Sequence, residues 1–115
     1  MIMQCMNDAE MLMRNFAEDT GLSSEKPPRR YLWTDAFAVC NFIQLCKDTG
    51  DETYKKWAIK LVAQVHEVLG KHRPDDLREG WLSSEQRPTR NGLRIGKDLP
   101  ERKAGEPLDQ RLEWE

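Results

Sequence analysis

YLWTDAFAVCNFIQLCKDTG at residues 31–50 and DETYKKWAIKLVAQVHEVLG at residues 51–70 decide the fold of this chain. Each block has the length of one helix, and only the short turn Asp48-Thr49-Gly50-Asp51 joins them. Helices joined by so short a connection lie antiparallel and side by side. The stretch from Tyr31 to Gly70 therefore predicts a helical hairpin.

The first helix of the hairpin is predicted to be apolar nearly all the way round. It should begin near Thr34 or Asp35, because either side chain can accept hydrogen bonds from the free N–H groups of a first turn. Between Ala36 and Cys46 only Asn41 and Gln44 interrupt the apolar residues. A helix of this kind belongs inside a larger body.

The second helix is predicted to bury one face only. Asp51 is its expected N-cap and Gly70 its expected left-handed C-cap, and Gly50 is expected to cap the first helix in the same way. Its apolar residues follow the i, i+3, i+4, i+7 spacing of a single stripe. They are Tyr54, Trp57, Ala58, Leu61, Val62, Val65, Val68 and Leu69. An inner helix followed by an outer helix is the repeating unit of a two-layered helical toroid, and such a pair has more apolar surface than it can cover by itself.

The rest of the chain is predicted to flank this hairpin. A methionine-rich helix from about Gln4 to Glu18 should pack on it, although such a face can also serve as an adaptable partner-binding surface. The chain then divides into residues 1–70, the N-terminal helix and the hairpin, and residues 71–115, a long irregular loop or extension. Within the second part, Asn91-Gly92 predicts a tight turn or a small β-hairpin at 89–95. The predicted fold class is all-α.

Composition excludes several classes of function. The formal net charge of −2 argues against binding to nucleic acid by general electrostatics. No stretch approaches the roughly 18 apolar residues of a membrane span, and the N-terminus lacks the basic region of a secretion signal, so a cytoplasmic location is expected. His66 and His72 have no partners at metal-ligand spacing, so neither a metal nor another cofactor is expected. The three cysteines are expected to be small core residues.

Asp35 is the candidate catalytic residue, because it stands at the start of the predicted inner helix, where a toroid has its mouth. The N–H groups and dipole of a helix start favour the charged form of a carboxyl, which suits a base or an anchor for hydroxyl groups. The alternative is a plain helix cap.

Aromatic and basic residues near the helix ends are candidates for substrate binding. Tyr31, Trp33 and Trp81 could stack on sugar rings, or they could be buried anchors. Arg90 and Arg94 flank the Asn-Gly turn and could bind anionic or hydroxyl groups, or they could form a solvated face.

Three stretches together resemble a known superfamily. RYLWTDAFAVCNF (30–42), TGDETY (49–54) and AIKLVAQVHEVLGKHRPDD (58–76) resemble the opening hairpin of bacterial six-hairpin glycosidase-like proteins, the alpha/alpha toroids. GWLSSEQRPTRNGLRIGKDLPER (80–102) and RLEWE (111–115) are similar to the loop that leads to the next inner helix in such proteins. The resemblance covers nearly all of the chain but only a fraction of a toroid.

The resemblance implies that the chain is an N-terminal fragment of a protein that acts on or binds carbohydrate. In such toroids two carboxylates hydrolyse the glycosidic bond, about 6.5–9.5 Å apart when the configuration inverts. Asp35 matches the position of a carboxylate that lines the mouth, and Glu113 or Glu115 could fall near another, but the sequence assigns no second catalytic partner. The fragment alone is expected to be inactive, and missing C-terminal hairpins would cover the inner helix. The alternative is a small interaction module that docks on another protein or forms a homodimer.

Overall fold

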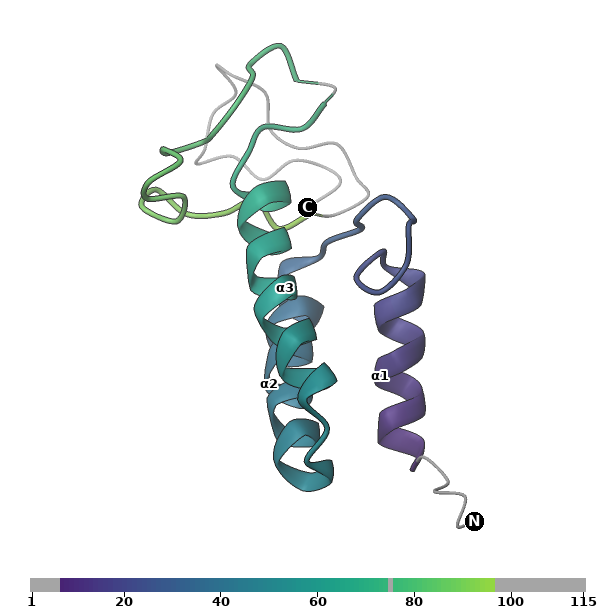
Figure 1. Cartoon of the computed structure of the whole chain (residues 1–115). Helices are drawn as coiled ribbons and strands as arrows, with labels where there is room; N and C mark the ends of the chain where they lie inside the picture. Colours follow the sequence, from purple (N-terminus) through teal and green to yellow (C-terminus); the bar gives the residue numbers. More distant parts are fainter. Residues whose placement is uncertain (1–6, 75, 97–115) are drawn as a thin grey trace.

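The structure is a computed structural model that describes residues 7–74 and 76–96. These residues form three helices and no strand: α1 (Asp8–Asp19), α2 (Leu32–Thr49) and α3 (Glu52–Leu69). Helices α2 and α3 form the antiparallel hairpin, and α1 stands beside it (Figure 1). The predicted all-α class and the helical hairpin are therefore confirmed for the described part of the chain.

Helix α2 begins earlier than predicted. Its N-cap is Tyr31, whose N–H donates to Oδ2 of Asp35 at 2.9 Å. The hydroxyl of Thr34 donates to the carbonyl oxygen of Tyr31 at 3.1 Å. Because both polar side chains reach back to Tyr31 from inside the first turn, the helix already starts at Leu32. The predicted start at Thr34 or Asp35 was wrong.

The turn between the two helices has the predicted caps. Gly50 has a φ of 74°, in the left-handed region, and its N–H donates to the carbonyl oxygen of Cys46. Oδ1 of Asp51 accepts from the N–H of Thr53 at 2.9 Å. The left-handed cap predicted at Gly70 was wrong, since its φ is −82°. A Cβ at Gly70 would collide with the carbonyl oxygen of His66, so this position needs glycine for space.

The core lies between the three helices, around Phe42. Its ring centroid is 5.8 Å from that of Trp57 and 6.4 Å from those of Tyr54 and Phe16. The predicted stripe of α3 supplies most of the remaining core, but Val62 is 41% exposed and was wrongly placed in it. The buried residues of α3 are Tyr54, Ala58, Leu61, Val65 and Leu69.

Helix α1 is fastened to the hairpin by a polar cluster as well as by its apolar face. The guanidinium of Arg14 lies over the rings of Tyr54 and Trp57, 5.2 and 5.4 Å from their centroids. Nε of Arg14 donates to the hydroxyl of Tyr54, and that hydroxyl donates to Oε2 of Glu10 at 2.5 Å. A salt bridge of 3.5 Å joins Arg14 to Asp51. The start predicted near Gln4 lies outside the described residues.

The segment after α3 returns to the start of α2. The N–H of Arg94 donates to the carbonyl oxygen of Leu69, and the N–H of Leu32 donates to that of Ile95, both at 2.8 Å. The Asn-Gly position forms a tight turn, in which the N–H of Gly92 donates to the carbonyl oxygen of Thr89 at 3.0 Å. Residues 93–96 therefore join the start of α2 to the end of α3, and we call this segment the seam.

Candidate functional site

One end of the hairpin carries the residues predicted to bind substrate. The first turn of α2, the last turn of α3 and the irregular segment after α3 meet at this end (Figure 1). Tyr31, Trp33 and Asp35 belong to the start of α2. Trp81 is paired with Lys71 through an isolated β-bridge just beyond α3. Arg94 is held against the last turn of α3.

Asp35 is buried at this end, with only 1% of its surface exposed. Its Oδ2 accepts the hydrogen bond from Tyr31 and lies 3.7 Å from Nε of Arg30. Its Oδ1 has no hydrogen-bond partner within the described residues. Asp35 therefore holds the start of α2, and its second oxygen is the only one left for another contact.

Arg30, which the sequence did not single out, is buried together with Asp35. Its Nη2 donates to the carbonyl oxygen of Thr20 at 3.1 Å, and its Nε donates to that of Arg29 at 3.0 Å. The guanidinium lies 5.8 Å from the ring centroid of Phe16. Arg30 thus ties the connector between α1 and α2 to the core. No sequence pattern marks it, because its partners belong to three different segments.

Burial raises the pKa of Asp35, although the charge of Arg30 and the N–H of Tyr31 act in the opposite direction. The sequence had suggested that the helix start would favour the charged carboxylate, and that expectation was wrong. The cost of removing the carboxylate from water outweighs the helix end and the nearby cation.

The raised pKa makes a testable contribution to stability. A group whose pKa is higher in the folded state stabilises the fold fully below its unfolded pKa, here 3.8, and loses that contribution as pH rises through the folded pKa. We expect the free energy of unfolding of the wild type, minus that of Asp35→Asn, to fall as pH rises above 3.8. Urea denaturation from about pH 3 to 7 measures it. A difference that grows with pH would show that the attraction of Arg30 dominates.

Two of the three candidate aromatic residues are accessible. Trp33 is 59% exposed and Tyr31 is 37% exposed, so both can meet a ligand. Trp81 is half-buried, and Nζ of Lys71 lies 4.6 Å from its ring centroid. Trp81 therefore packs beyond the end of α3, whereas Tyr31 and Trp33 remain free to stack.

The two candidate arginines differ in their surroundings. Arg94 acts as a cap for α3: its Nη2 donates to the carbonyl oxygen of Val68 at 2.7 Å and its Nε to that of Lys71 at 2.6 Å. These carbonyls stand at a helix end, where no intrahelical donor remains. Arg90 is exposed, and its N–H donates to the carbonyl oxygen of Arg87 in the turn. A role of either side chain toward a ligand stays a prediction.

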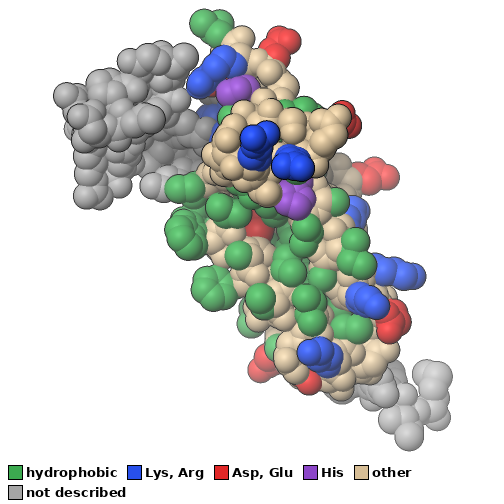
Figure 2. Space-filling view, turned by 90° about the vertical axis from the view of Figure 1, so that its left-hand side faces the viewer, with side chains coloured by type: hydrophobic (Ala, Val, Ile, Leu, Met, Phe, Trp, Pro, Cys, Tyr) green, Lys and Arg blue, Asp and Glu red, His purple; other side chains and the backbone are tan. Residues whose placement is uncertain are grey.

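An apolar face of the hairpin is accessible. Ile59 is 63% exposed, Ile43 43% and Val62 41%, and these three residues, which line the space between α2 and α3, form what we call the open face. Phe37 is 70% exposed but does not line this space. Figure 2 shows hydrophobic side chains gathered on this side of the hairpin, which is turned away from α1. The prediction that α2 carries more apolar surface than its neighbours cover is confirmed for the described residues.

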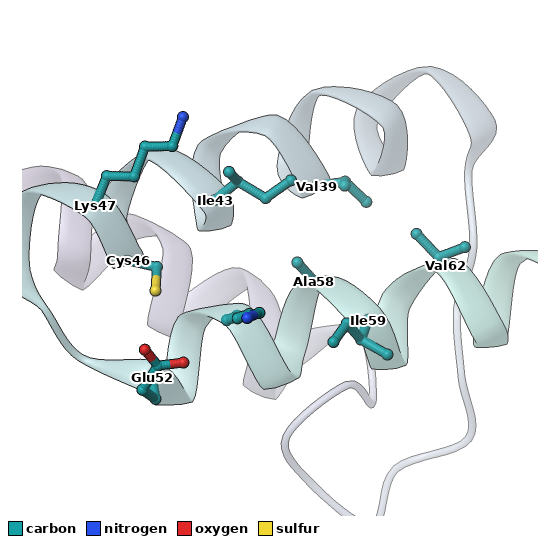
Figure 3. Close-up of a pocket in the computed structure, with 9 residues that line it drawn as sticks. Val39, Ile43, Cys46, Lys47, Glu52, Ala58, Ile59 and Val62 are labelled. Atoms are coloured by element: carbon teal, nitrogen blue, oxygen red, sulfur yellow. The ribbon is translucent and has the colours of Figure 1, made fainter.

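A groove of about 460 Å³ crosses the open face between α2 and α3 (Figure 3). Its floor includes Ala58, whose small side chain leaves the space, and its polar rim carries Lys47, Glu52 and Lys55. Figure 3 shows Lys47 of α2 and Glu52 of α3 at the same end of this groove. The remaining lining residues are Val39, Ile43, Cys46, Ile59 and Val62.

Other kinds of site are not found in the part of the chain that the structure describes. No group of three or more His, Cys, Asp or Glu residues there could hold a metal ion. No helix there is long and apolar enough to cross a membrane. Cys46 is a partly exposed free thiol, and Cys40 is exposed, so its predicted place in the core was wrong. No family model, curated protein or solved structure matches this chain.

Proposed function

We propose that this chain supplies the first helical hairpin of a larger α/α toroid of the six-hairpin glycosidase type, in which further helices cover the open face. The observation that carries this proposal is the exposure of Ile43, Ile59 and Val62 on one side of an ordered hairpin. Each large apolar side chain left in water forgoes roughly 1.5–3 kcal/mol. The open face is therefore a surface for packing against other helices.

The arrangement of the two helices also supports this proposal. Helix α2 buries Phe42 toward α1 and α3 and leaves Phe37 and Ile43 exposed, so it carries apolar residues on more than one side. Helix α3 turns its charged residues, such as Lys56 and Lys60, to water. In a toroid, a helix with apolar residues on several sides, such as α2, is an inner helix, and a helix with one charged side, such as α3, is an outer helix.

The proposed ligand of the complete toroid is a carbohydrate. Tyr31 and Trp33 are the proposed stacking residues, because they are exposed at the end of the hairpin where the toroid mouth would be. Asp35 is the proposed acid or hydroxyl-binding group of the complete toroid; in this structure its Oδ1 is buried and has no hydrogen-bond partner within the described residues. The hairpin alone lacks a second carboxylate in a known position and is proposed to be inactive.

The test extends the chain through the reading frame downstream of codon 115. We expect further hairpins of the same inner and outer pattern and binding of the longer protein to oligosaccharides on a glycan array. Trp33→Ala should weaken that binding about three- to tenfold, the usual contribution of one aromatic contact. Leu77→Ala, at a fully exposed loop residue, is the matched control and should leave it unchanged. A downstream reading frame that encodes no further hairpins would contradict the proposal. Glycan binding that Trp33→Ala leaves unchanged would exclude a stacking role for Trp33.

A second candidate function is a small interaction module, which works by self-association. The observation that favours it is the presence of residues of opposite charge, Lys47 and Glu52, at one end of the apolar groove. Because this rim carries both a positive and a negative residue, it can face the same rim of a second copy so that opposite charges meet. A toroid neighbour would need no particular charge at these positions.

A further inference from the structure

We propose that residues 106–115 of this chain, which lie outside the described residues, cover the open face by binding in the groove between α2 and α3. This inference rests on the proposed function in one respect: it treats the open face as a packing surface. It goes further by naming the segment that covers the face and the direction in which that segment runs.

The open face is small, which favours an attached segment over a separate protein. Ile43, Ile59 and Val62 are between 41% and 63% exposed. Three partly exposed aliphatic side chains offer far less than the roughly 800 Å² that each partner of a stable complex buries. A segment of the same chain needs less area, because it does not lose the translational and rotational freedom that a separate partner loses on binding.

The charges of residues 106–115 are complementary to those of the groove. The groove is lined by two lysines and one glutamate, Lys47, Lys55 and Glu52, which leaves it with an excess of positive charge. The segment, EPLDQRLEWE, has four acidic residues and one arginine, which leaves it with an excess of negative charge. Both lysines can therefore face an acidic residue, and Glu52 can face Arg111.

The segment also supplies apolar side chains. Leu108, Leu112 and Trp114 stand among its charged residues. The apolar residues that line the groove are mostly aliphatic: Val39, Ile43, Ala58, Ile59 and Val62. Contact between these two sets removes apolar surface of both from water, which is the main favourable contribution to such packing.

The segment starts within reach of the groove. Gly96 lies against the backbone of Arg30, since a Cβ there would be 2.2 Å from the carbonyl oxygen of Arg30. The chain therefore leaves the described part of the structure beside the start of α2. Val39 and Val62 of the groove are each seven positions from this end of the hairpin, which is about 10 Å along a helix. Residues 97–105 can span roughly 30 Å, enough for this distance and for the width of one helix, about 10–12 Å.

The order of residues along the segment matches the order along the groove. A chain that arrives from the start of α2 meets the two valines first. It meets the three charged residues of the groove last, because they belong to the end of α2 and the start of α3. Leu108 therefore reaches the valine end of the groove, while Glu113 and Glu115 reach the lysines.

The first experiment uses Cys46, a partly exposed thiol that lines the groove. Labelling of the full chain with N-ethylmaleimide, followed by digestion and mass spectrometry, gives the rate of each cysteine separately. Cys40 is the internal reference, because it is exposed and does not line the groove. A short tether gives an effective concentration of about 1 mM, so a groove affinity of about 0.1 mM keeps about nine molecules in ten covered. Leu112→Asp should therefore speed the labelling of Cys46 about tenfold and leave Cys40 unchanged.

Leu77→Asp is the matched control for this experiment, because it makes the same change at a fully exposed loop residue. It should leave Cys46 as slow as in the wild type. Equal rates of Cys46 labelling in the wild type and Leu112→Asp would overturn the inference. Protection of Cys46 that is lost on dilution would also overturn it, because the cover would then come from another molecule.

The second experiment tests the direction of the segment with a carbodiimide, which joins a lysine amine to a carboxylate in contact with it. Lys47 and Lys55 should be linked to Glu113 or Glu115 in the monomeric full chain. The internal controls are two lysines of α3 that are exposed but do not line the groove, Lys56 and Lys60. Equal linkage of all four lysines to the segment, or none, would overturn the proposed position of the acidic residues.

Failure of this inference can be distinguished from failure of the toroid proposal. Labelling and cross-linking need no sequence beyond residue 115, whereas the toroid proposal is tested by the downstream reading frame and by glycan binding. A Cys46 that is equally accessible in every variant overturns the cover by residues 106–115 and leaves further hairpins to cover the open face.

Discussion

Phe42→Ala is expected to lower the free energy of unfolding by about 3–5 kcal/mol, the usual cost of deleting a buried phenylalanine side chain. Phe42 is fully buried, and its ring contacts aromatic residues of both α1 and α3. The deletion therefore removes a side chain at which all three helices meet. Domains of this size have a total stability of about 5–15 kcal/mol, so this loss is between about a fifth of the total and all of it.

Urea denaturation followed by circular dichroism measures this effect, at a concentration low enough to keep the chain monomeric. Phe37→Ala is the matched control, because it makes the same chemical change on the same helix at a residue that is 70% exposed. It should change the stability of the monomer by no more than about 0.5 kcal/mol. Equal losses for the two variants would mean that Phe37 is covered in solution, contrary to its exposure in the structure.

Arg30→Met is expected to lower the free energy of unfolding by about 3–5 kcal/mol at neutral pH, because it leaves a buried carboxylate without its cation. Asp35 is only 1% exposed, so water cannot replace the guanidinium. The variant also removes the hydrogen bond from Nη2 to the carbonyl oxygen of Thr20. Methionine keeps most of the apolar volume beside Phe16, so the loss reports the charge and hydrogen bonds rather than a cavity.

The double variant Arg30→Met/Asp35→Asn identifies the cause of that loss. Asparagine keeps an oxygen that can accept from the N–H of Tyr31 but carries no charge. The double variant should therefore be more stable than Arg30→Met alone, by about 1–3 kcal/mol. Equal instability of the two variants would show that the hydrogen bonds of Arg30, and not its charge, hold the connector.

The hairpin could be predicted from sequence because its signals are local. Gly50 and Asp51 stand where a left-handed C-cap and an N-cap are needed, and the spacing of apolar residues in α3 identifies the buried side. The excess of apolar surface on α2 followed from composition alone. Neighbours within four residues along the chain determine all of these features.

The predictions were wrong where a contact with a distant part of the chain, or a competing local hydrogen bond, determines the structure. Thr34 and Asp35 are good N-cap residues, but in the structure both lie inside the first turn and hydrogen-bond to the backbone of Tyr31. The residue types alone do not show whether such side chains cap the helix themselves or lie one turn further in. The pKa of Asp35 is raised by its burial, which the residue types around it in the sequence do not reveal. Arg94 could not be recognised as a helix cap, because Val68, whose carbonyl it contacts, lies far away in the chain.

The seam formed by residues 93–96 has a consequence for the order of folding. Helices α2 and α3 meet through a four-residue turn, so their pairing closes a small loop and can occur early. The bond between the N–H of Leu32 and the carbonyl oxygen of Ile95 joins residues more than sixty positions apart. Contacts of such separation form last, at a large entropic cost. During synthesis the hairpin can therefore form first, while the chain is still on the ribosome. Docking of the seam, which joins the start of α2 to the end of α3, is then the late step.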